Sequence, residues 1–587
     1  MEFYYSAERG IQILVSLLKQ YGIKKIVASP GSSNVSLVES LQNDPFFEMY
    51  SMVDERSAAY LACGLAQESG EAVVLTCTSA TASRNYVPGL TEAYYRHLPI
   101  LAITATTQLA NVGHLQRQSM DRSSIQKDIA NMSVLVRVVK DKLDEWDCII
   151  KVNKALSELF HRDGGPVHIN LETEFSMDFS VRELPKARII TRIETHQLSQ
   201  KPIIDCQRVG VFIGSHDTMS QSLISAIDAF CERNNAICLI DHTSHYNGRY
   251  GINYSILGMQ EYCGSQITNL DLVIHLGMIS GDDPTTNALK SGAKEVWRVS
   301  KDGEIIDTFG KLKYVFEMDE ELFFKQYSIG EKKGTSFYDE CIQEYNTVIS
   351  DLPELPFSNL WIAKSLYDKL PKGSRVQLGI LHSFRSWTIF SLDPSIKVYS
   401  NVGGFGIDGG MSSLIGSALC DKNRIYYGIF GDLQFFYDMN VLGIRDMPSN
   451  VRIILINNGK GNEFRNYHHT ASIFGEDTDK FIAAAGHFGN KSKTLVKHYA
   501  EDLGFRYFSA DNKEQFNGII PDIIALQNTE SPLLVEVFTD TEHESKALEL
   551  VSTFRVNKSD YAVRKLKDFG KSLLPDDVLA GIRKRRK

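Results

Sequence analysis

The sequence predicts an α/β protein made of three domains, each built on a doubly wound parallel sheet. Short apolar runs alternate with helical patterns from the N-terminus onward, and repeated βα units with apolar strands are typical of parallel sheets. Near the end of the chain, an acid and an amide follow two successive apolar runs. A length of 587 residues also exceeds one domain. We expect domains at 1–182, 183–352 and 353–550, and a basic extension at 551–587.

Composition indicates an intracellular globular protein. The net charge of −9 gives no reason to expect nucleic acid as a partner. Nine cysteines without a CxxC pair indicate a reducing compartment. The first residues lack the apolar core of a signal peptide, and no apolar run approaches the roughly 18 residues that span a bilayer. We therefore expect a cytoplasmic protein that binds neither nucleic acid nor membranes.

In the first third of the chain, a strand that ends near Val53 is followed by Asp54-Glu55 and an apolar helix. Burial raises the pKa of a carboxyl group, so Glu55 in an apolar site could hold or share a proton. Alternatively, Asp54 and Glu55 only complement the helix dipole. The residues alone leave both interpretations open.

Two other regions before residue 357 have weaker signals. The polar segment 110–126 follows a strand, and it is either a loop of the site or a solvated loop. The second α/β pattern lies between irregular segments at 180–205 and 353–356. It has no GxGxxG phosphate loop at its first turn, so the sequence gives no positive sign of a nucleotide there.

The strongest signal runs from Ile425 to Phe464. An apolar run, 425–430, ends in Gly431-Asp432, and a second run, 451–456, ends in Asn457-Asn458. The carboxyl ends of neighbouring parallel strands meet at the ligand-binding edge of a sheet. Two oxygen ligands there suit Mg²⁺, which completes its shell with water and phosphate oxygens. The alternative is an ordinary βαβ unit in which Asp432 caps a helix.

Flanking segments agree with a diphosphate site. The glycine-rich turn 401–410 opens a helix of small residues, and such a turn lets backbone N–H groups approach phosphate. Residues 379–385 form a predicted site loop after a strand. Beyond Asn458, residues 459–481 form a polar stretch that we call the lid segment. Lys460, Arg465, His468 and His469 make it cationic, and the two histidines are either surface residues or catalysts.

These motifs resemble the thiamine diphosphate enzymes. Gly431-Asp432 followed by Asn457-Asn458 is similar to their diphosphate-binding signature, with Leu433 where glycine is usual. S-P-G-S near residue 30, D-E-R-S-A-A at 54–59, C-T-S-A-T-A at 77–82 and N-Y-V-P-G-L-T-E-A at 85–93 resemble the group that contains the menaquinone-pathway synthase. The resemblance implies pyrimidine-binding, middle and diphosphate-binding domains, thiamine diphosphate and Mg²⁺ as cofactors, and a homodimer or homotetramer. In such enzymes the middle domain is structural or binds a flavin or nucleotide.

The resemblance also implies roles for individual residues. The metal ligands are Asp432, Asn458 and the main-chain carbonyl of Lys460. Glu55 matches the glutamate that promotes the imino tautomer of the cofactor. The catalytic group is completed by Gln116 (with Gln118 as a near-register alternative), Arg385 and Glu463. Glu463 either protonates an intermediate or points to solvent. The implied cofactor-binding residues are Ser32, Glu55, Thr78, Asn85, Gly379, Gly406, Ile407, Asp408, Gly431 and Leu433, with Ile407 as the apolar wedge under the cofactor.

The substrate-binding arginines of that group are largely replaced. Ser33, Thr107, Asn287-Ala288 and Val402 stand where the group has arginine or lysine-arginine, and Arg385 is kept. Such residues do not replace a bidentate arginine–carboxylate contact. We therefore expect a 2-oxo-acid decarboxylase and carboligase, a transferase or lyase, that joins a short donor such as pyruvate to a nucleotide-linked keto sugar. The alternatives are the menaquinone-pathway reaction of 2-oxoglutarate with isochorismate, and a non-catalytic paralogue.

Overall fold

The structure is a computed structural model that describes residues 4–261, 263, 265–486, 492–526 and 530–556. The chain divides into two compact units. The first comprises residues 1–199 and 302–317, and the second comprises residues 200–301 and 318–587. The named strands pair only in parallel among the described residues, and helices alternate with them. This confirms the predicted α/β class with doubly wound parallel sheets.

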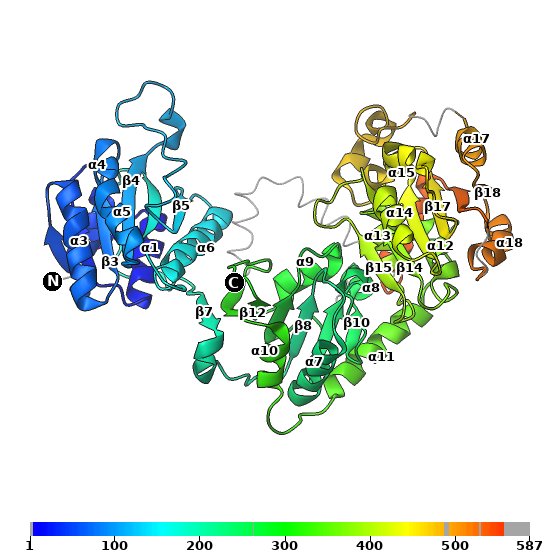
Figure 1. Ribbon diagram of the computed structural model, residues 1–587, viewed down its shortest axis with the longest axis horizontal. Helices are drawn as coiled ribbons and strands as arrows, with labels where there is room; N and C mark the ends of the chain where they lie inside the picture. The colour runs from blue at the N-terminus through cyan, green and yellow to red at the C-terminus, as the bar shows by residue number, and fades with distance from the viewer. Residues whose placement is uncertain (1–3, 262, 264, 487–491, 527–529, 557–587) are drawn as a thin grey trace. The chain divides into compact units, whose positions relative to one another are not determined.

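The first unit has a six-stranded sheet in the order β2-β1-β3-β4-β6-β5 (Figure 1). Its strands are β1 (Lys25–Ala28), β2 (Glu48–Ser51), β3 (Val73–Cys77), β4 (Ile100–Thr107), β5 (Met132–Val136) and β6 (Val167–Thr173). Its helices are α1 (Arg9–Gln20), α2 (Val35–Gln42), α3 (Glu55–Ser69), α4 (Thr81–Asn85), α5 (Val87–Tyr95), η1 (Leu109–Asn111) and α6 (Lys142–Glu158). Two short strands, β7 (Thr191–Glu194) and β13 (Leu312–Glu317), pair in parallel in the same unit.

Helices cover both faces of this sheet, because successive residues of each strand pack on opposite faces. Ile26 and Val74 pack in one apolar cluster with α1, α2 and α6. Val27 and Leu75, one residue further along each strand, pack in another cluster with α3 and α5. Successive strand residues point to opposite faces, so apolar runs without alternation require helices on both sides.

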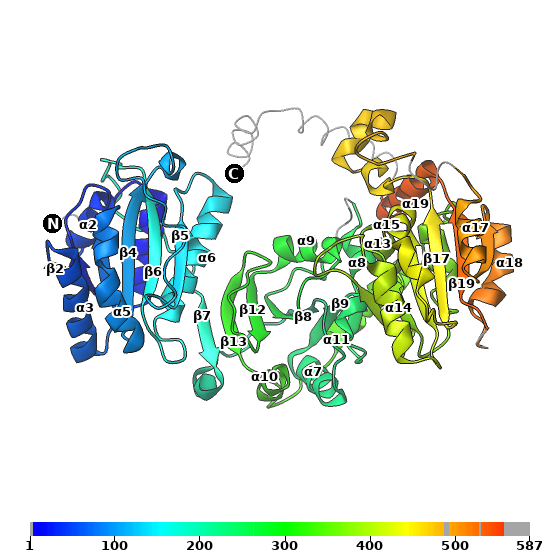
Figure 2. The ribbon, with the colours of Figure 1, turned by 45° about the horizontal axis from the view of Figure 1, so that its top comes forward.

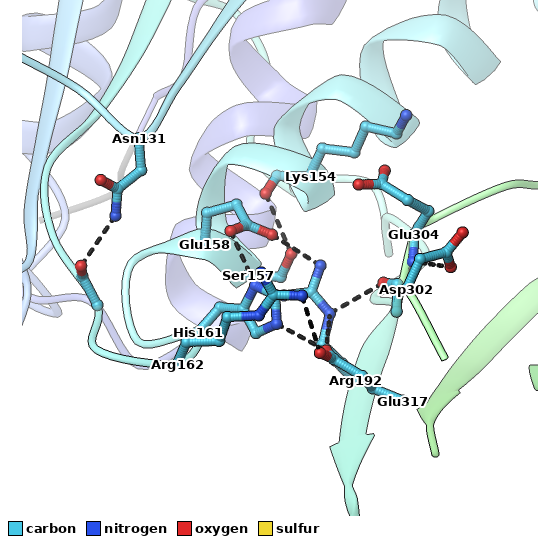
Figure 3. A network of polar contacts seen from close by, with 12 residues as sticks. Asn131, Lys154, Ser157, Glu158, His161, Arg162, Arg192, Asp302, Glu304 and Glu317 are labelled. Carbon is cyan, nitrogen blue, oxygen red and sulfur yellow. Dashed lines mark hydrogen bonds and ion pairs between the residues drawn. The ribbon is translucent and has the colours of Figure 1, made fainter. Parts of the chain in front are cut away.

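A polar network joins the end of α6 to the β7–β13 pair (Figure 3). The His161 ring lies between two carboxylates, with Nδ1 2.9 Å from Glu158 and Nε2 2.6 Å from Glu317. Arg192 on β7 donates to Glu158 at 2.7 Å, and Arg162 contacts Glu317 at 3.2 Å. The network fixes the direction in which the chain leaves the first sheet.

The second unit begins with the strand order β10-β9-β8-β11-β12, which is the order of a dinucleotide-binding fold. The elements are β8 (Val209–Ile213), α7 (Gln221–Asn234), β9 (Ala236–Ile240), η3 (His242–Ser244), β10 (Gly251–Asn253), α8 (Ser255–Gly258), β11 (Leu272–Leu276), α9 (Asp283–Gly292) and β12 (Glu295–Ser300). Further helices of this unit are α10 (Glu320–Tyr327) and α11 (Ser336–Ser350), while η2 (Thr195–Gln200) stands where the first unit passes into the second.

The crevice where this strand order reverses is filled by backbone. The N–H of Gly214 donates to Leu276 at 3.1 Å, and the N–H of Met278 donates to Ser215 at 2.8 Å. A Cβ on Gly214 would lie 2.0 Å from the Met278 carbonyl oxygen. The loops after β8 and β11 therefore pair with each other at the point where dinucleotides bind in such folds.

The second unit ends with a six-stranded sheet in the order β15-β14-β16-β17-β19-β18 (Figure 2). Its strands are β14 (Arg375–Leu378), β15 (Lys397–Ser400), β16 (Tyr426–Gly431), β17 (Val451–Asn457), β18 (Arg506–Ala510) and β19 (Leu533–Phe538). Its helices are α12 (Asn359–Leu366), α13 (His382–Thr388), α14 (Gly410–Cys420), α15 (Asp432–Asp438), η4 (Met439–Gly443), η5 (Asn462–Arg465), η6 (Thr470–Thr478), α17 (Leu495–Asp502), α18 (Lys513–Ile523) and α19 (Thr541–Thr553). All seven residues of β17 are buried, so two central strands place their carboxyl ends at a shielded edge.

The predicted domain boundaries stay predictions. Residues 557–587, most of the predicted basic extension, lie outside the described residues. No helix in the described part of the chain is both long and apolar enough to cross a membrane.

Candidate active site

The carboxyl ends of β16 and β17 bring the predicted metal ligands to one edge. The two strands pair in register, with Gly431 opposite Ile456, so Asp432 and Asn458 each follow the end of a central strand. Asp432 begins α15 and is only 4% exposed. Burial raises its pKa to about 7, against hydrogen bonds from backbone N–H groups such as those of Leu433 and Gly459. A carboxyl group in this position is stabilised as an anion when a cation lies beside it.

The structure separates the two adjacent asparagines. Asn457 is buried and donates to Glu536 at 2.6 Å. The Oδ1 atom of Asn458 is buried and has no hydrogen-bond partner among the described residues. Native structures rarely leave a buried acceptor unpaired, so Asn458 is the asparagine with a free ligand atom.

These groups fit a small hard cation. One carboxylate and one unpaired amide oxygen are the oxygen ligands that Mg²⁺ takes together with phosphate oxygens and water. No group of three or more histidines, cysteines, aspartates and glutamates among the described residues could hold a metal. The edge therefore offers a partial oxygen shell, which a diphosphate would complete.

Two glycines beside this turn make room for a side chain that the sequence analysis missed. A Cβ on Gly379 would lie 2.3 Å from Oε1 of Gln434, and a Cβ on Gly410 would lie 2.1 Å from its Nε2. Gln434 is 5% exposed. Its amide thus lies close to the loop after β14 and to the start of α14, and a Cβ at either glycine would force this amide to shift.

The glycine-rich turn is open at its tip. A Cβ on Gly403 or Gly404 would meet nothing within 4 Å. Ile407 is half-buried and Asp408 exposed, while a Cβ on Gly406 would lie 2.3 Å from the Asp408 carboxylate. Val402, at a position where the resemblance implies arginine, is 4% exposed and so belongs to the core.

The lid segment begins directly after Asn458, in the turn that follows β17 and that we call the metal turn because it holds the predicted ligands Asn458 and Lys460. A Cβ on Gly461 would lie 3.2 Å from the Leu433 side chain, so the two turns are in close contact. Lys460 and Arg465 both contact Asp479, at 2.5 and 2.7 Å. The lid is less cationic than its lysine and arginine suggest, because these two residues share one carboxylate. His469 accepts the N–H of Ala471 at 3.1 Å and caps η6.

Arg385 and Glu463 form a bidentate ion pair. Nη1 and Nη2 of Arg385 donate to the two carboxylate oxygens at 2.9 and 2.8 Å. Burial acts to raise the pKa of Glu463, but the hydrogen bonds and charge of Arg385 outweigh it and hold that pKa below its usual range. The Glu463 carboxylate is therefore paired inside the protein, and the role that it takes in catalysis stays a prediction. The structure also ends the loop after β14 at Leu381 and places Arg385 on α13.

In the first unit, Glu55 lies at the start of α3. Asp54 caps this helix by accepting the N–H of Ser57 at 2.8 Å, and Glu55 takes no part in the cap. The Glu55 carboxylate is half-buried and accepts from the exposed Asn85 at 3.4 Å. Because Asp54 alone supplies the cap, the carboxylate of Glu55 is available for another contact.

The other predicted residues of the first unit lie on loops at strand ends. Thr78 donates to the Ser33 hydroxyl at 3.0 Å, and a Cβ on Gly31 would lie 2.4 Å from the Thr78 Cβ. The loops after β1 and β3 are therefore tightly packed, while Ser32 between them is exposed. Gln116 and Gln118 are both exposed in the long loop after β4, so the structure brings neither to Glu55.

Comparison with known proteins decides the family. Residues 8–129 match the family described as thiamine pyrophosphate enzyme, N-terminal TPP binding domain. The chain is 30% identical over 557 residues to the 2-succinyl-5-enolpyruvyl-6-hydroxy-3-cyclohexene-1-carboxylate synthase of Bacteroides thetaiotaomicron, covering 93% of this chain and 98% of the relative. Identities to the synthases of the same name from Bacteroides fragilis and Phocaeicola vulgatus are 30% and 29%, with the same coverage.

The chain belongs to the thiamine diphosphate enzyme family. Within that family it is similar to the synthases named above over nearly their whole length. It is therefore a thiamine diphosphate-dependent enzyme, and the predicted recognition is confirmed.

Four residues of this thiamine diphosphate enzyme were missed by the sequence analysis. Besides Gln434 and Asp479, Asn462 is 5% exposed and neither of its amide atoms has a partner among the described residues. Arg122, in the long loop of the first unit, donates to the Ala105 carbonyl at 3.1 Å and to Asn170 at 2.8 Å, and its buried Nη1 is likewise unpaired. An asparagine next to a metal turn and an arginine within a predicted site loop were the only signals in the sequence.

Proposed function

We propose that this enzyme uses thiamine diphosphate and Mg²⁺ to decarboxylate a 2-oxo acid and to transfer the resulting acyl-anion equivalent to an acceptor. The observation that carries the proposal is the edge formed by Asp432 and Asn458, one a buried acid and the other an unpaired amide oxygen. Thiamine diphosphate supplies the electron sink for decarboxylation when bound; the protein orients it and excludes water.

In this proposal the chain's own residues hold and position the cofactor. Asp432, Asn458 and the carbonyl of Lys460 would hold the cation, which would neutralise charge on the diphosphate. Backbone N–H groups near Gly379, Gly406 and Gly431 approach the phosphates, as helix N-termini and glycine turns allow. Glu55, whose carboxylate is not used as a helix cap, exchanges a proton with the aminopyrimidine.

Two substrate pairs fit this chemistry, and similarity favours the first. Relatives that match 93% of the chain at about 30% identity carry the name of the synthase that joins a 2-oxoglutarate-derived unit to isochorismate. On this candidate, the two substrates are 2-oxoglutarate and isochorismate, and residues such as Arg122 replace the missing arginines as carboxylate ligands.

A specific contact favours the second pair. Arg385, the one substrate arginine that the sequence retains, is already engaged by Glu463. Lys460, Arg465 and Asp479 form a cluster with one excess positive charge, while the whole lid segment holds four acidic side chains and three lysine or arginine side chains. This pattern suits a short donor such as pyruvate and an acceptor with a remote anionic group, such as a nucleotide-linked keto sugar. The presence of Glu55, Asp432 and Asn458 speaks against a non-catalytic paralogue.

We further propose a cytoplasmic homodimer or homotetramer. All nine cysteines are free thiols, in keeping with a reducing compartment. Glu55 and Asp432 lie in different compact units, and a site that takes Glu55 from a second copy would need at least two chains. In analytical ultracentrifugation with cofactor present, a fully active monomer at nanomolar concentration would contradict this arrangement.

The proposal is tested in two steps. Calorimetry should give Mg²⁺-dependent binding of thiamine diphosphate that Asp432→Ala abolishes and that the exposed control Asp446→Ala leaves unchanged. A matrix of 2-oxo-acid donors and of acceptors, read by mass spectrometry, should then give a ligated product. Efficient product from 2-oxoglutarate and isochorismate would establish the first substrate pair and overturn the second, whereas binding without any decarboxylation would overturn the enzymatic proposal.

A further inference from the structure

The Arg385–Glu463 ion pair lies close to the metal turn, and this location carries an inference about the donor substrate. Glu463 is on η5, which begins one residue after Gly461, and Gly461 packs on Leu433 beside Asp432. Arg385 is on α13, which follows the loop that packs on Gln434. The ion pair therefore connects the lid segment to the loop after β14, both of which flank the diphosphate edge.

The two parallel hydrogen bonds that Arg385 donates show that its guanidinium is suited to hold a carboxylate. Both terminal nitrogens of the guanidinium donate to one carboxylate, at 2.9 and 2.8 Å, which is the strongest and most specific way for arginine to bind a carboxylate. The side chains are 18% and 17% exposed, so the contact is largely shielded from solvent. A substrate carboxylate that used these same two donors would have to displace Glu463.

Neighbouring groups make that displacement unfavourable. Asn466 donates to Glu463 at 3.1 Å, so the carboxylate is held from a second side. Burial lowers the pKa of His382 to about 4, with the charge of Arg385 acting in the same direction. That ring is consequently neutral at pH 7 and supplies no second cation. The charges of Arg385 and Glu463 cancel, so this pair offers no excess positive charge to a second substrate carboxylate.

Stability alone is a poor reason for such a contact. A shielded ion pair often stabilises a fold no more than a packed apolar pair of the same size, because both charges lose their hydration. Specificity is the better explanation, since a fixed internal carboxylate raises the cost of binding a competing one.

We propose that Glu463 determines donor specificity by occupying Arg385, so that the enzyme takes 2-oxo acids with one carboxylate and discriminates against 2-oxo diacids. This inference rests on the proposed function with its second substrate pair, because 2-oxoglutarate, the donor of the first pair, is itself a 2-oxo diacid. In that step the bond between the carboxylate carbon and the 2-oxo carbon breaks, CO₂ leaves, and the electron pair stays with the former carbonyl carbon. Glu463 touches neither of these atoms in the proposal and only restricts what lies beyond them.

The test compares Glu463→Gln with the wild type in the enzyme loaded with thiamine diphosphate and Mg²⁺. Glu476→Gln is the matched control, since Glu476 is an exposed acid of the same lid segment and its loss changes the net charge equally. Binding of glutarate, an unreactive dicarboxylate, is measured by calorimetry. Glu463→Gln removes the charged partner of Arg385 and so frees the guanidinium for glutarate. The affinity for glutarate should rise about tenfold or more in this variant and stay unchanged in Glu476→Gln.

The second readout is the ratio of kcat/KM for pyruvate to kcat/KM for 2-oxoglutarate. The wild type should favour pyruvate by about tenfold or more, and Glu463→Gln should lower this ratio by a similar factor. A wild type that uses the diacid as well as the monoacid overturns the inference, even where the variant fails to fold. Unchanged glutarate affinity in folded Glu463→Gln overturns it as well. Failure of the proposed function looks different, because the wild type would then decarboxylate neither acid.

Discussion

The buried amide of Gln434 lies where a side chain on Gly379 would have to go, with Oε1 2.3 Å from the ideal Cβ position. The same amide blocks Gly410 from the other side, through Nε2. One glutamine amide therefore lies against glycines at two distant points of the sequence, and a Cβ at either position would force it to shift. This relationship places the loop after β14 and the start of α14 beside the turn that begins with Asp432.

We predict that Gly379→Ala destabilises the second unit by about 1–3 kcal/mol, the usual cost of overpacking a filled core. In a Gln434→Ala background the added methyl has room, so the same substitution should cost less, and the coupling should reach about 0.5–3 kcal/mol. Urea denaturation of the four proteins of the cycle measures it. Gly403→Ala is the control, because a Cβ there meets nothing within 4 Å. Additive effects within error would contradict the shared space.

The adjacent asparagines should behave oppositely. Asn457→Ala removes the donor to the buried Glu536 and should cost about 1–3 kcal/mol of stability, since a buried acceptor is left unpaired. Asn458→Ala removes an atom that has no protein partner, so it should leave the melting temperature of the cofactor-free protein nearly unchanged and weaken Mg²⁺-dependent cofactor binding. Differential scanning calorimetry and titration calorimetry separate the two effects. If Asn457→Ala and Asn458→Ala lost cofactor affinity equally, the prediction that only Asn458 binds the cation would be wrong.

Some residues of the candidate site could be predicted from the sequence, whereas their interaction partners could not. Asp432 and Asn458 were predictable because they directly follow apolar strands, and parallel strands fix where their carboxyl ends lie. The α/β class was predictable for the same reason. The ion-pair partners of the charged side chains were not predictable, because they are distant in the sequence. Asp479 contacts Lys460 from 19 residues away, and Arg385 contacts Glu463 from 78 residues away.

Tertiary packing also decided which polar residues are free. The strand pattern alone does not distinguish Asn457 from Asn458. The family resemblance selects Asn458, and the hydrogen bond of Asn457 to Glu536 on β19 gives the physical difference. Gln434 carries no motif, and its role comes from two glycines in other elements. Burial and pairing of this kind depend on chain segments that no local pattern connects.

Glu55 gives a prediction for the cofactor chemistry. Glu55→Gln should bind thiamine diphosphate with Mg²⁺ nearly as well as the wild type, because the diphosphate contacts remain. Exchange of the cofactor's carbon-2 proton should slow by roughly 10²–10⁴-fold, the usual worth of a general acid–base group. Proton NMR in deuterated buffer measures it.

Asp54→Ala is the informative control for Glu55. Asp54 caps α3 through Ser57, so its loss should cost about 0.5–2 kcal/mol of stability and leave proton exchange intact. If both variants slowed exchange equally, Glu55 would act only through the structure of the helix.

His168 gives a prediction for pH. Its ring lies between the hydroxyls of Thr104 and Ser133, each at 2.8 Å, and burial lowers its pKa to about 3, with the charge of Arg122 acting in the same direction. The unfolded chain has the ordinary histidine pKa of about 6.5 and so binds more protons between these values. The first unit should therefore keep full stability from this residue above about pH 6.5 and lose it as pH falls toward 3.

Protection of β6 in hydrogen exchange under mild urea, measured at pH 7 and pH 5, reports this loss of stability locally. His168→Gln should flatten this dependence, whereas the exposed His114→Gln should preserve it. The same slope in both variants would mean that another group titrates.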